Sequence, residues 1–196
     1  MPPSIKVSET QIIEAAVKIV REKGESALNA RELARELGCS TRPIFRVYGA
    51  MSDLKEVVLQ EAGKIFQEVM SLSMRKENSI LSLGLATVHF AKDEPNLFKL
   101  FFMSNFLKYQ SLYEMVDQNN DYGGIDALIK MTGLPAQPSK KMFISLWMIA
   151  HGIASMIATN PFAVSDDEIT ELLVNAYDGF LRVYKEKSTE GVDKYE

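Results

Sequence analysis

The sequence has few of the residues on which disulfide, redox and metal chemistry depend. Its 196 residues include one cysteine, Cys39, and two histidines, His89 and His151. One cysteine excludes an internal disulfide and is typical of a protein in a reducing cytosol. The cysteine and the histidines lie far apart in the sequence, without the spacing of metal ligands. We therefore expect no metal site and no cofactor.

Signatures of catalysis and of membrane insertion are also missing. The sequence contains no nucleophile–base pair, phosphate-binding loop or glycine-rich dinucleotide turn, so it supports no catalytic residue and no enzyme. No apolar run approaches the ~18 residues that span a bilayer, and the first residues lack a signal-peptide core. We expect a soluble cytoplasmic protein that has no membrane partner.

Strand patterns are absent as well. No segment alternates apolar and polar residues, whereas apolar residues recur at helical spacing along the chain. With 46% hydrophobic residues, the chain can bury one good core, or one core plus a small satellite domain. We predict an all-α fold. The expected helices cover residues 8–23, 29–37, 40–48, 52–70, 80–93, 97–117, 125–131, 139–159 and 166–185.

Charge is divided unevenly along the chain, whose formal net charge is −4. Residues 1–55 carry nine Lys and Arg against seven Asp and Glu, which gives +2. The remaining residues carry thirteen against nineteen, which gives −6. A mildly basic head on an acidic body suits local contact with DNA and little non-specific binding.

Residues 29–48, NARELARELGCSTRPIFRVY, predict two short helices joined by a tight turn. Asn29 can cap the first helix with its side-chain oxygen, and Glu32 can reach back to the N–H of that cap. Gly38 follows the last periodic residue, where a left-handed backbone favours glycine. The first helix is therefore expected to end at this turn.

The second helix of the pair is expected to begin at Ser40, whose side chain would cap it and satisfy the N–H of Arg42. Pro43 is tolerated in the first turn because no internal hydrogen bond is lost there. We expect Ile44, Val47 and Tyr48 to face inward, and Thr41, Arg42, Phe45 and Arg46 to face outward. Two helices, a glycine turn and two outward arginines predict a helix-turn-helix.

This region resembles the tetracycline-repressor (TetR) family of bacterial regulators. Residues 8–24 are similar to the family's first helix, and residues 29–54 to its helix-turn-helix with the start of its fourth helix. The matching residues are Gly24, Arg31, Leu33, Ala34, Gly38, Ser40, Ile44, Phe45, Tyr48 and Leu54. The sequence departs from the family at Phe45, where tyrosine is usual, at Val47, where histidine is frequent, and at Met51, where a phosphate-binding lysine is frequent.

The resemblance implies a DNA-binding domain in residues 1–52 and a helical ligand-binding and dimerisation domain in residues 53–196. Arginine can bind guanine through two hydrogen bonds, and helix N-termini can bind phosphate. The candidate DNA-contacting residues are Asn29, Arg31, Ser40, Thr41, Arg42, Pro43, Phe45, Arg46 and Tyr48. A solvated helix face is the alternative for this set, and a place in the core is the alternative for Tyr48.

Aromatic residues and methionines concentrate in the predicted helix 97–117. Core packing would explain each of them singly, but together they cover more of the helix than one buried stripe requires. Rigid rings beside flexible methionines can line an adaptable apolar cavity, and the resemblance implies an inducer pocket in this middle region. The candidate ligand-contacting residues are Phe98, Phe102, Met103, Phe106, Tyr109, Tyr113, Trp147 and His151.

Trp147 and His151 lie four residues apart and precede Gly152, which is similar to a Trp-x-x-x-His-Gly pattern of one C-terminal subgroup of the family. A structural role for His151 inside the bundle is the alternative to ligand contact.

The last two predicted helices have regular apolar stripes, and each contains a mid-helix glycine. Such a glycine costs ~1 kcal/mol relative to alanine, which close approach of another helix would offset. The resemblance implies that these helices pair with their symmetry mates in a four-helix homodimer interface. The candidate interface residues are Gly152, Met156, Leu172, Leu173, Ala176, Gly179 and Phe180. Packing within one subunit is the alternative.

The expected function is that of a ligand-responsive transcriptional regulator, a repressor, which binds a palindromic double-stranded DNA operator as a homodimer. A small apolar or amphipathic molecule would release it. One alternative is a DNA-binding protein that responds to no ligand, and another is a helical small-molecule-binding protein or enzyme.

Overall fold

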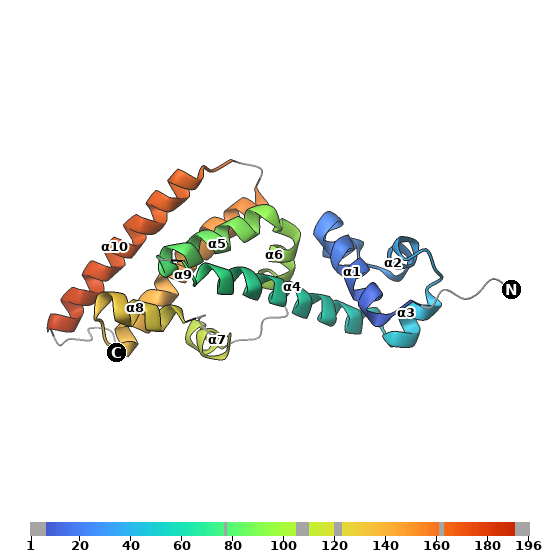
Figure 1. The fold of residues 1–196 in the computed structure, drawn as a ribbon, viewed down its shortest axis with the longest axis horizontal. Helices are drawn as coiled ribbons and strands as arrows, with labels where there is room; N and C mark the ends of the chain where they lie inside the picture. The colour runs from blue at the N-terminus through green and yellow to red at the C-terminus, as the bar shows by residue number, and fades with distance from the viewer. Residues whose placement is uncertain (1–6, 77, 105–109, 120–122, 161–162, 191–196) are drawn as a thin grey trace. The chain divides into compact units, whose positions relative to one another are not determined.

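The computed structural model describes residues 7–76, 78–104, 110–119, 123–160 and 163–190, and these residues form helices without any strand (Figure 1). The predicted all-α fold is confirmed. The α-helices are α1 (Glu9–Lys23), α2 (Ala30–Glu36), α3 (Arg42–Val47), α4 (Met51–Ser73), α5 (Ser79–Asp93), α6 (Pro95–Phe102), α7 (Leu112–Asn119), α8 (Gly124–Thr132), α9 (Ala136–Thr159) and α10 (Asp166–Glu190). A short 3-10 helix, η1 (Glu25–Ala27), follows α1.

The first helix has the ends that its sequence predicts. Ser8 accepts a hydrogen bond from the N–H of Gln11, and the Gln11 side chain accepts one from the N–H of Ser8, which completes a capping box. Gly24 ends the helix at φ +83°, a conformation that glycine adopts without strain. Its apolar stripe buries Ile12, Ala16, Ile19 and Val20, whereas Ile13 is partly exposed.

The helices form two compact units. The first unit comprises residues 1–67 and 94–106, and the second comprises residues 68–93 and 107–196. Helix α4 therefore runs through both, and α6 belongs to the first unit although α5 belongs to the second. This division describes packing, so the boundary predicted near residue 52 stays a prediction about separable domains.

Helix α6 joins the first unit through contacts with α1 and α4. The Asn96 side chain donates a hydrogen bond to the carbonyl of Arg21 (3.0 Å), and the Arg21 side chain donates one to Glu94 (2.8 Å). Phe98, Phe101 and Phe102 of α6 form a cluster with Phe66 of α4, in which neighbouring ring centroids are 4.7–6.0 Å apart. This phenylalanine cluster and the two polar contacts fix α6 on both helices.

The second unit is organised around α9, which packs against α5, α8 and α10. Helix α9 is long and apolar enough to cross a membrane, which the sequence analysis did not recognise. The most apolar 18-residue window of this helix is 39% buried inside the protein, and its inward face includes the fully buried Met142 and Ala154. These features are those of the central helix of a globular unit.

One predicted helix is wrong. The continuous helix expected over residues 97–117 is two helices in the structure, α6 and α7, because α6 ends at Phe102. The gaps between the helices predicted over residues 80–93, 125–131, 139–159 and 166–185 separate helices in the structure as well. Elsewhere the predicted helices are confirmed with ends that shift by a few residues, for example at α4, which continues to Ser73.

Candidate DNA-binding site

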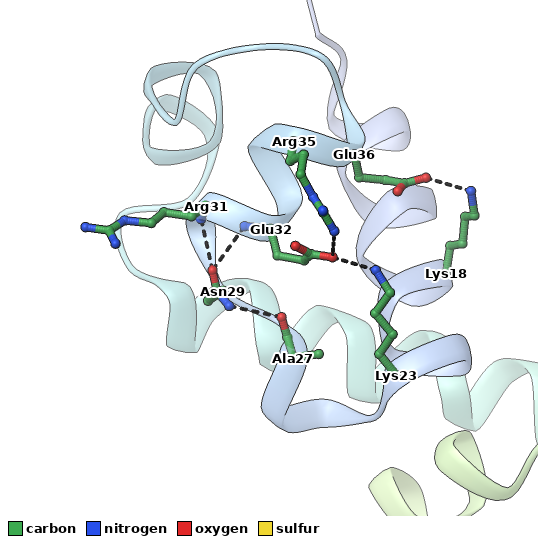
Figure 2. Close-up of polar contacts among 8 residues, drawn as sticks. All are labelled: Lys18, Lys23, Ala27, Asn29, Arg31, Glu32, Arg35 and Glu36. Atoms are coloured by element: carbon green, nitrogen blue, oxygen red, sulfur yellow. Dashed lines mark hydrogen bonds and ion pairs between the residues drawn. The ribbon is translucent and has the colours of Figure 1, made fainter.

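The N-terminus of α2 is capped by Asn29. Its side-chain oxygen accepts hydrogen bonds from the N–H groups of Arg31 (3.1 Å) and Glu32 (3.0 Å), as Figure 2 shows. The predicted return contact from Glu32 to the cap is wrong. The Glu32 carboxylate instead accepts hydrogen bonds from Lys23 of α1 (2.6 Å) and Arg35 of α2 (2.5 Å), because two cations bind a carboxylate more strongly than one amide does.

The turn after α2 contains Gly38 at φ +61°, the left-handed backbone that was predicted there. The predicted cap of the following helix is wrong, because α3 begins one residue later than expected. Thr41 precedes the first helical residue and forms no side-chain capping hydrogen bond, so Ser40 does not cap Arg42. Pro43 is then the second helical residue, where the missing N–H has no internal partner to lose.

Helix α3 has one buried side. Ile44 is fully buried, and Tyr48, which ends the helix, is 7% exposed and donates a hydrogen bond to Glu9. Burial is the main cause that raises the pKa of the Tyr48 phenol, with smaller contributions from Glu9. Tyr48 therefore ties α3 to α1 as a core residue.

The opposite side of α3 is open. Arg42, Arg46 and Phe45 are exposed, with Phe45 at 46%, as predicted. Val47 was expected to face inward but is 37% exposed, because a helix of only six residues has room for one fully buried position beside its end. The exposed side thus combines two cations with apolar groups.

Ion pairs separate the basic residues of segment 7–55 into two groups. Of the nine basic residues in segment 1–55, Lys6 lies outside the described residues, which leaves eight. Five are paired: Lys18 with Glu36, Arg21 with Glu94, Lys23 and Arg35 with Glu32, and Lys55 with Glu25. The other three, Arg31, Arg42 and Arg46, are exposed and form no ion pair with any residue that the structure describes.

The ion pairs of α1 and α2 lie on one side of α2. Figure 2 shows Lys18, Lys23 and Arg35 gathered around Glu32 and Glu36, whereas the Arg31 side chain points away from them. Hydrogen bonds from Lys23 and then Arg35 lower the pKa of the Glu32 carboxyl. The Lys18 ammonium likewise lowers the pKa of Glu36. The three cations and two carboxylates on this side of α2 leave a net charge of +1, and Arg31 lies on the other side without a described carboxylate partner.

The predicted ligand-contacting residues do not form one site in the described part of the chain. Phe98 is fully buried in the phenylalanine cluster, which Phe102 also joins. Met103 and Tyr113 are 49% and 44% exposed, and Lys140 lies 5.5 Å above the Tyr113 ring. Phe106 and Tyr109 lie outside the described residues. Core packing explains Phe98 and Phe102 without a ligand.

Trp147 and His151 of α9 stack on each other as their spacing predicts. Their ring centroids are 4.8 Å apart and the rings are nearly parallel, at 22°. Burial lowers the pKa of the His151 imidazole, so the neutral ring is favoured in the folded protein.

The candidate interface residues divide into a buried and an open set. Leu173 is 6% exposed and lies against Gly84 of α5, so this residue packs inside its own subunit. Met156 and Leu172 are 57% and 48% exposed. A Cβ added at Gly152 or Gly179 would meet no atom within 4 Å, and Ala176 and Phe180 are partly exposed. Helices α9 and α10 therefore carry an open apolar face.

Sequence reasoning missed a groove between the end of α4 and α5, which has a volume of about 210 Å³. It is lined by Val69, Ser73, Lys76, Ser82, Leu85, Ala86 and His89. The signal was present, because residues 82, 85, 86 and 89 follow helical spacing and mix polar with apolar side chains. No group of three potential metal ligands gathers in the residues that the structure describes.

Known proteins share this architecture. A family model described as the tetracyclin repressor-like C-terminal domain matches residues 80–177, half of the chain. The structure is similar to that of a TetR-like transcriptional regulator from Rhodococcus sp. RHA1, with a TM-score of 0.58 and 16% identity over 93% of this chain and 98% of the other. It is also similar to a protein described as a TetR-family transcriptional regulator from Mesorhizobium loti MAFF303099, with a TM-score of 0.54 and 16% identity over 88% and 94%. No curated protein sequence matches the chain.

These findings define an all-α fold with an N-terminal helix-turn-helix. The chain belongs to the TetR family.

Proposed function

We propose that the protein is a ligand-responsive repressor that binds a near-palindromic operator as a homodimer, in the cytoplasm. The observation that carries the DNA contact is the set of three unpaired arginines, Arg31, Arg42 and Arg46. A cation already bound to a carboxylate contributes little net attraction for phosphate, whereas an uncompensated one contributes fully. The three arginines all belong to the helix-turn-helix.

The three arginines would have different roles, because they lie on two different helices. Helix α3 would enter the major groove, where Arg42 and Arg46 can reach base edges or flanking phosphates. Arg31, in the first turn of α2, would bind the backbone beside the groove. Ser40, Thr41, Pro43 and the exposed ring of Phe45 would complete the surface, and Asn29 would act as the cap of α2.

The open face of α9 and α10 supports the homodimer. Its exposed apolar side chains include Met148, Met156, Leu172 and Val183. Gly152 and Gly179 leave room in this face for a second helix to approach closely. A twofold axis through it would place two heads on one DNA, and two successive major grooves demand a separation of about 34 Å.

Release by a ligand requires a route from the C-terminal helices to the head. Helix α6 offers one, because Glu94 and Asn96 bind Arg21 at the end of α1. A ligand that binds more tightly when α6 occupies one of two positions would shift the equilibrium of α6, and of α1 with it, toward that position. The shift is limited by the difference between the ligand's binding free energies for the two positions. The protein would then bind its operator when α6 and α1 are in one position and release it when they are in the other.

Salt-dependent binding to an operator selected from random-sequence DNA tests the proposal. Six arginines in a dimer limit the slope of log K against log salt to about −5.4, at roughly 0.9 per neutralised phosphate. Arg31→Met should flatten the slope by about 1.8, because it removes one phosphate contact from each head. Lys18→Met is the matched control, since Lys18 is already paired with Glu36, and should leave the slope unchanged. If no sequence is selected, or if Arg31→Met, Arg42→Met and Arg46→Met all bind like the parent, the proposal is wrong.

A further inference from the structure

The groove between α4 and α5 is lined by both apolar and polar residues. Val69, Leu85 and Ala86 supply apolar surface, of which Ala86 is 8% exposed. The hydroxyls of Ser73 and Ser82, the ammonium of Lys76 and the imidazole of His89 supply polar groups. An apolar surface bordered by a few polar groups is the usual construction of a small-molecule site.

The charge of this groove is set by Lys76. Lys76 is exposed and forms no ion pair with any residue that the structure describes. Ser73 is the last residue of α4 and Ser82 lies in the first turn of α5, so the negative end of one helix and the positive end of the other both face this region. These opposite helix ends largely cancel, so no charge on the described residues compensates the ammonium through an ion pair.

An acidic group beside His89 is already engaged. Asp166, at the start of α10, lies 3.3 Å from His89 Nε2 and 3.4 Å from Lys92 Nζ. His89 first, and then Lys92, lower the pKa of the Asp166 carboxyl. Asp166 therefore does not neutralise Lys76, and it links the groove through His89 to helix α10.

We propose that this groove binds a small amphipathic monocarboxylate, and that this anion is the effector. Its carboxylate would accept hydrogen bonds from Lys76 and Ser82, and its short alkyl chain would cover Val69, Leu85 and Ala86. A volume of about 210 Å³ holds roughly seven water-sized groups at ~30 Å³ each, which matches a five-carbon acid. The binding site stands on the groove alone, whereas the effector role rests on the proposed regulatory function.

Calorimetric titration of the full-length protein with pentanoate tests the site. Pentanamide is the neutral isostere, and pentylammonium reverses the charge. We expect pentanoate to bind at least tenfold more tightly than either. Equal binding of pentanoate and pentanamide would overturn the proposal, as would no detectable binding of pentanoate.

Substitutions locate the bound anion. Lys76→Met should weaken pentanoate binding about tenfold, and Lys130→Met, which removes an exposed lysine of α8 without a described ion pair, should not. Ser82→Leu should fill the groove and abolish binding, while far-ultraviolet circular dichroism checks that the helices remain. Undiminished binding to both Lys76→Met and Ser82→Leu would place the anion elsewhere and overturn the proposal.

A DNA measurement separates this inference from the proposed function. Pentanoate at saturating concentration should release the operator from the parent protein and not from Lys76→Met. If pentanoate binds in the groove but the operator complex persists, the groove is a carboxylate site and the effector role is wrong. If no DNA is bound at all, the regulatory function fails while the titrations still decide the site.

Discussion

A Cβ atom on Gly63 of α4 would lie 2.8 Å from Cε2 and 3.2 Å from Cζ of Phe101 on α6. Real Cβ atoms essentially never approach another atom as closely as the first of these distances. Phe101 is also held by Phe66 and Phe102 in the phenylalanine cluster, so its ring has little freedom to retreat. The absent side chain at Gly63 therefore allows α6 to lie against α4.

Gly63→Ala should destabilise the protein. The ring must shift or the helices must separate, and overpacking of this kind costs about 1–3 kcal/mol. Helix propensity returns up to ~1 kcal/mol, so we expect a net loss of up to about 2 kcal/mol in the free energy of unfolding. Urea denaturation followed by circular dichroism measures it. A more stable Gly63→Ala variant would mean that the Phe101 ring gives way freely.

Gly152→Leu and Gly179→Leu should convert the proposed dimer to a monomer. An added Cβ at either glycine would meet no other described part of its own subunit within 4 Å, so we expect leucine to be tolerated in the monomer and to obstruct a second copy. Sedimentation equilibrium should report the mass of one chain, and operator affinity should fall because the two heads are no longer tethered. Full-strength dimers of both variants would contradict the interface on α9 and α10.

Asn29→Ala should destabilise the protein by about 1 kcal/mol, since an N-cap acceptor is lost. The N–H groups of Arg31 and Glu32 would then have to bind water. Asn29→Asp is the matched control, because it keeps the acceptor oxygen and should retain most of the stability. Equal losses in both variants, measured by urea denaturation, would show that the contact of the Asn29 amide with the carbonyl of Ala27 matters more than the cap.

The partly buried imidazole of His151 should make stability depend on pH. Its pKa is lowered in the folded protein, so the unfolded chain binds the proton more readily. The free energy of unfolding should therefore fall as the pH drops below the unfolded value of about 6.5, and be unaffected above it. Comparing urea midpoints of the parent and His151→Gln at pH 5 and pH 8 isolates this contribution from that of the carboxylates. Parallel pH profiles would contradict it.

Local rules account for the parts of the fold that the sequence predicts well. The caps at Ser8 and Asn29 and the left-handed Gly38 depend on residues within a few positions of each other, so a single sequence reveals them. The end of α6 at Phe102 has no such local signal, since apolar residues continue beyond it. Of the two partners of Glu32, Arg35 lies one turn away on the same helix, whereas Lys23 comes from α1, and its proximity depends on how α1 and α2 pack.

The candidate DNA site follows the same division. The outward direction of Arg42, Phe45 and Arg46 is a consequence of helical spacing and was predictable. The pairing of Lys18 and Lys23 with carboxylates of α2 was not, because it requires α1 and α2 to be placed side by side. The groove between α4 and α5 likewise exists only once two separate helices are paired.

The discontinuity of the first unit has a consequence for protein engineering. The segment that completes it, residues 94–106, is supplied by the chain only after α5 has been made. A chimaera that takes its head from this protein and is joined at residue 52 or 67 would receive α1 without the Glu94 and Asn96 contacts to Arg21. Transferring the DNA specificity of this regulator to another protein would thus require two separate segments, the helix-turn-helix and α6, and not one continuous N-terminal segment.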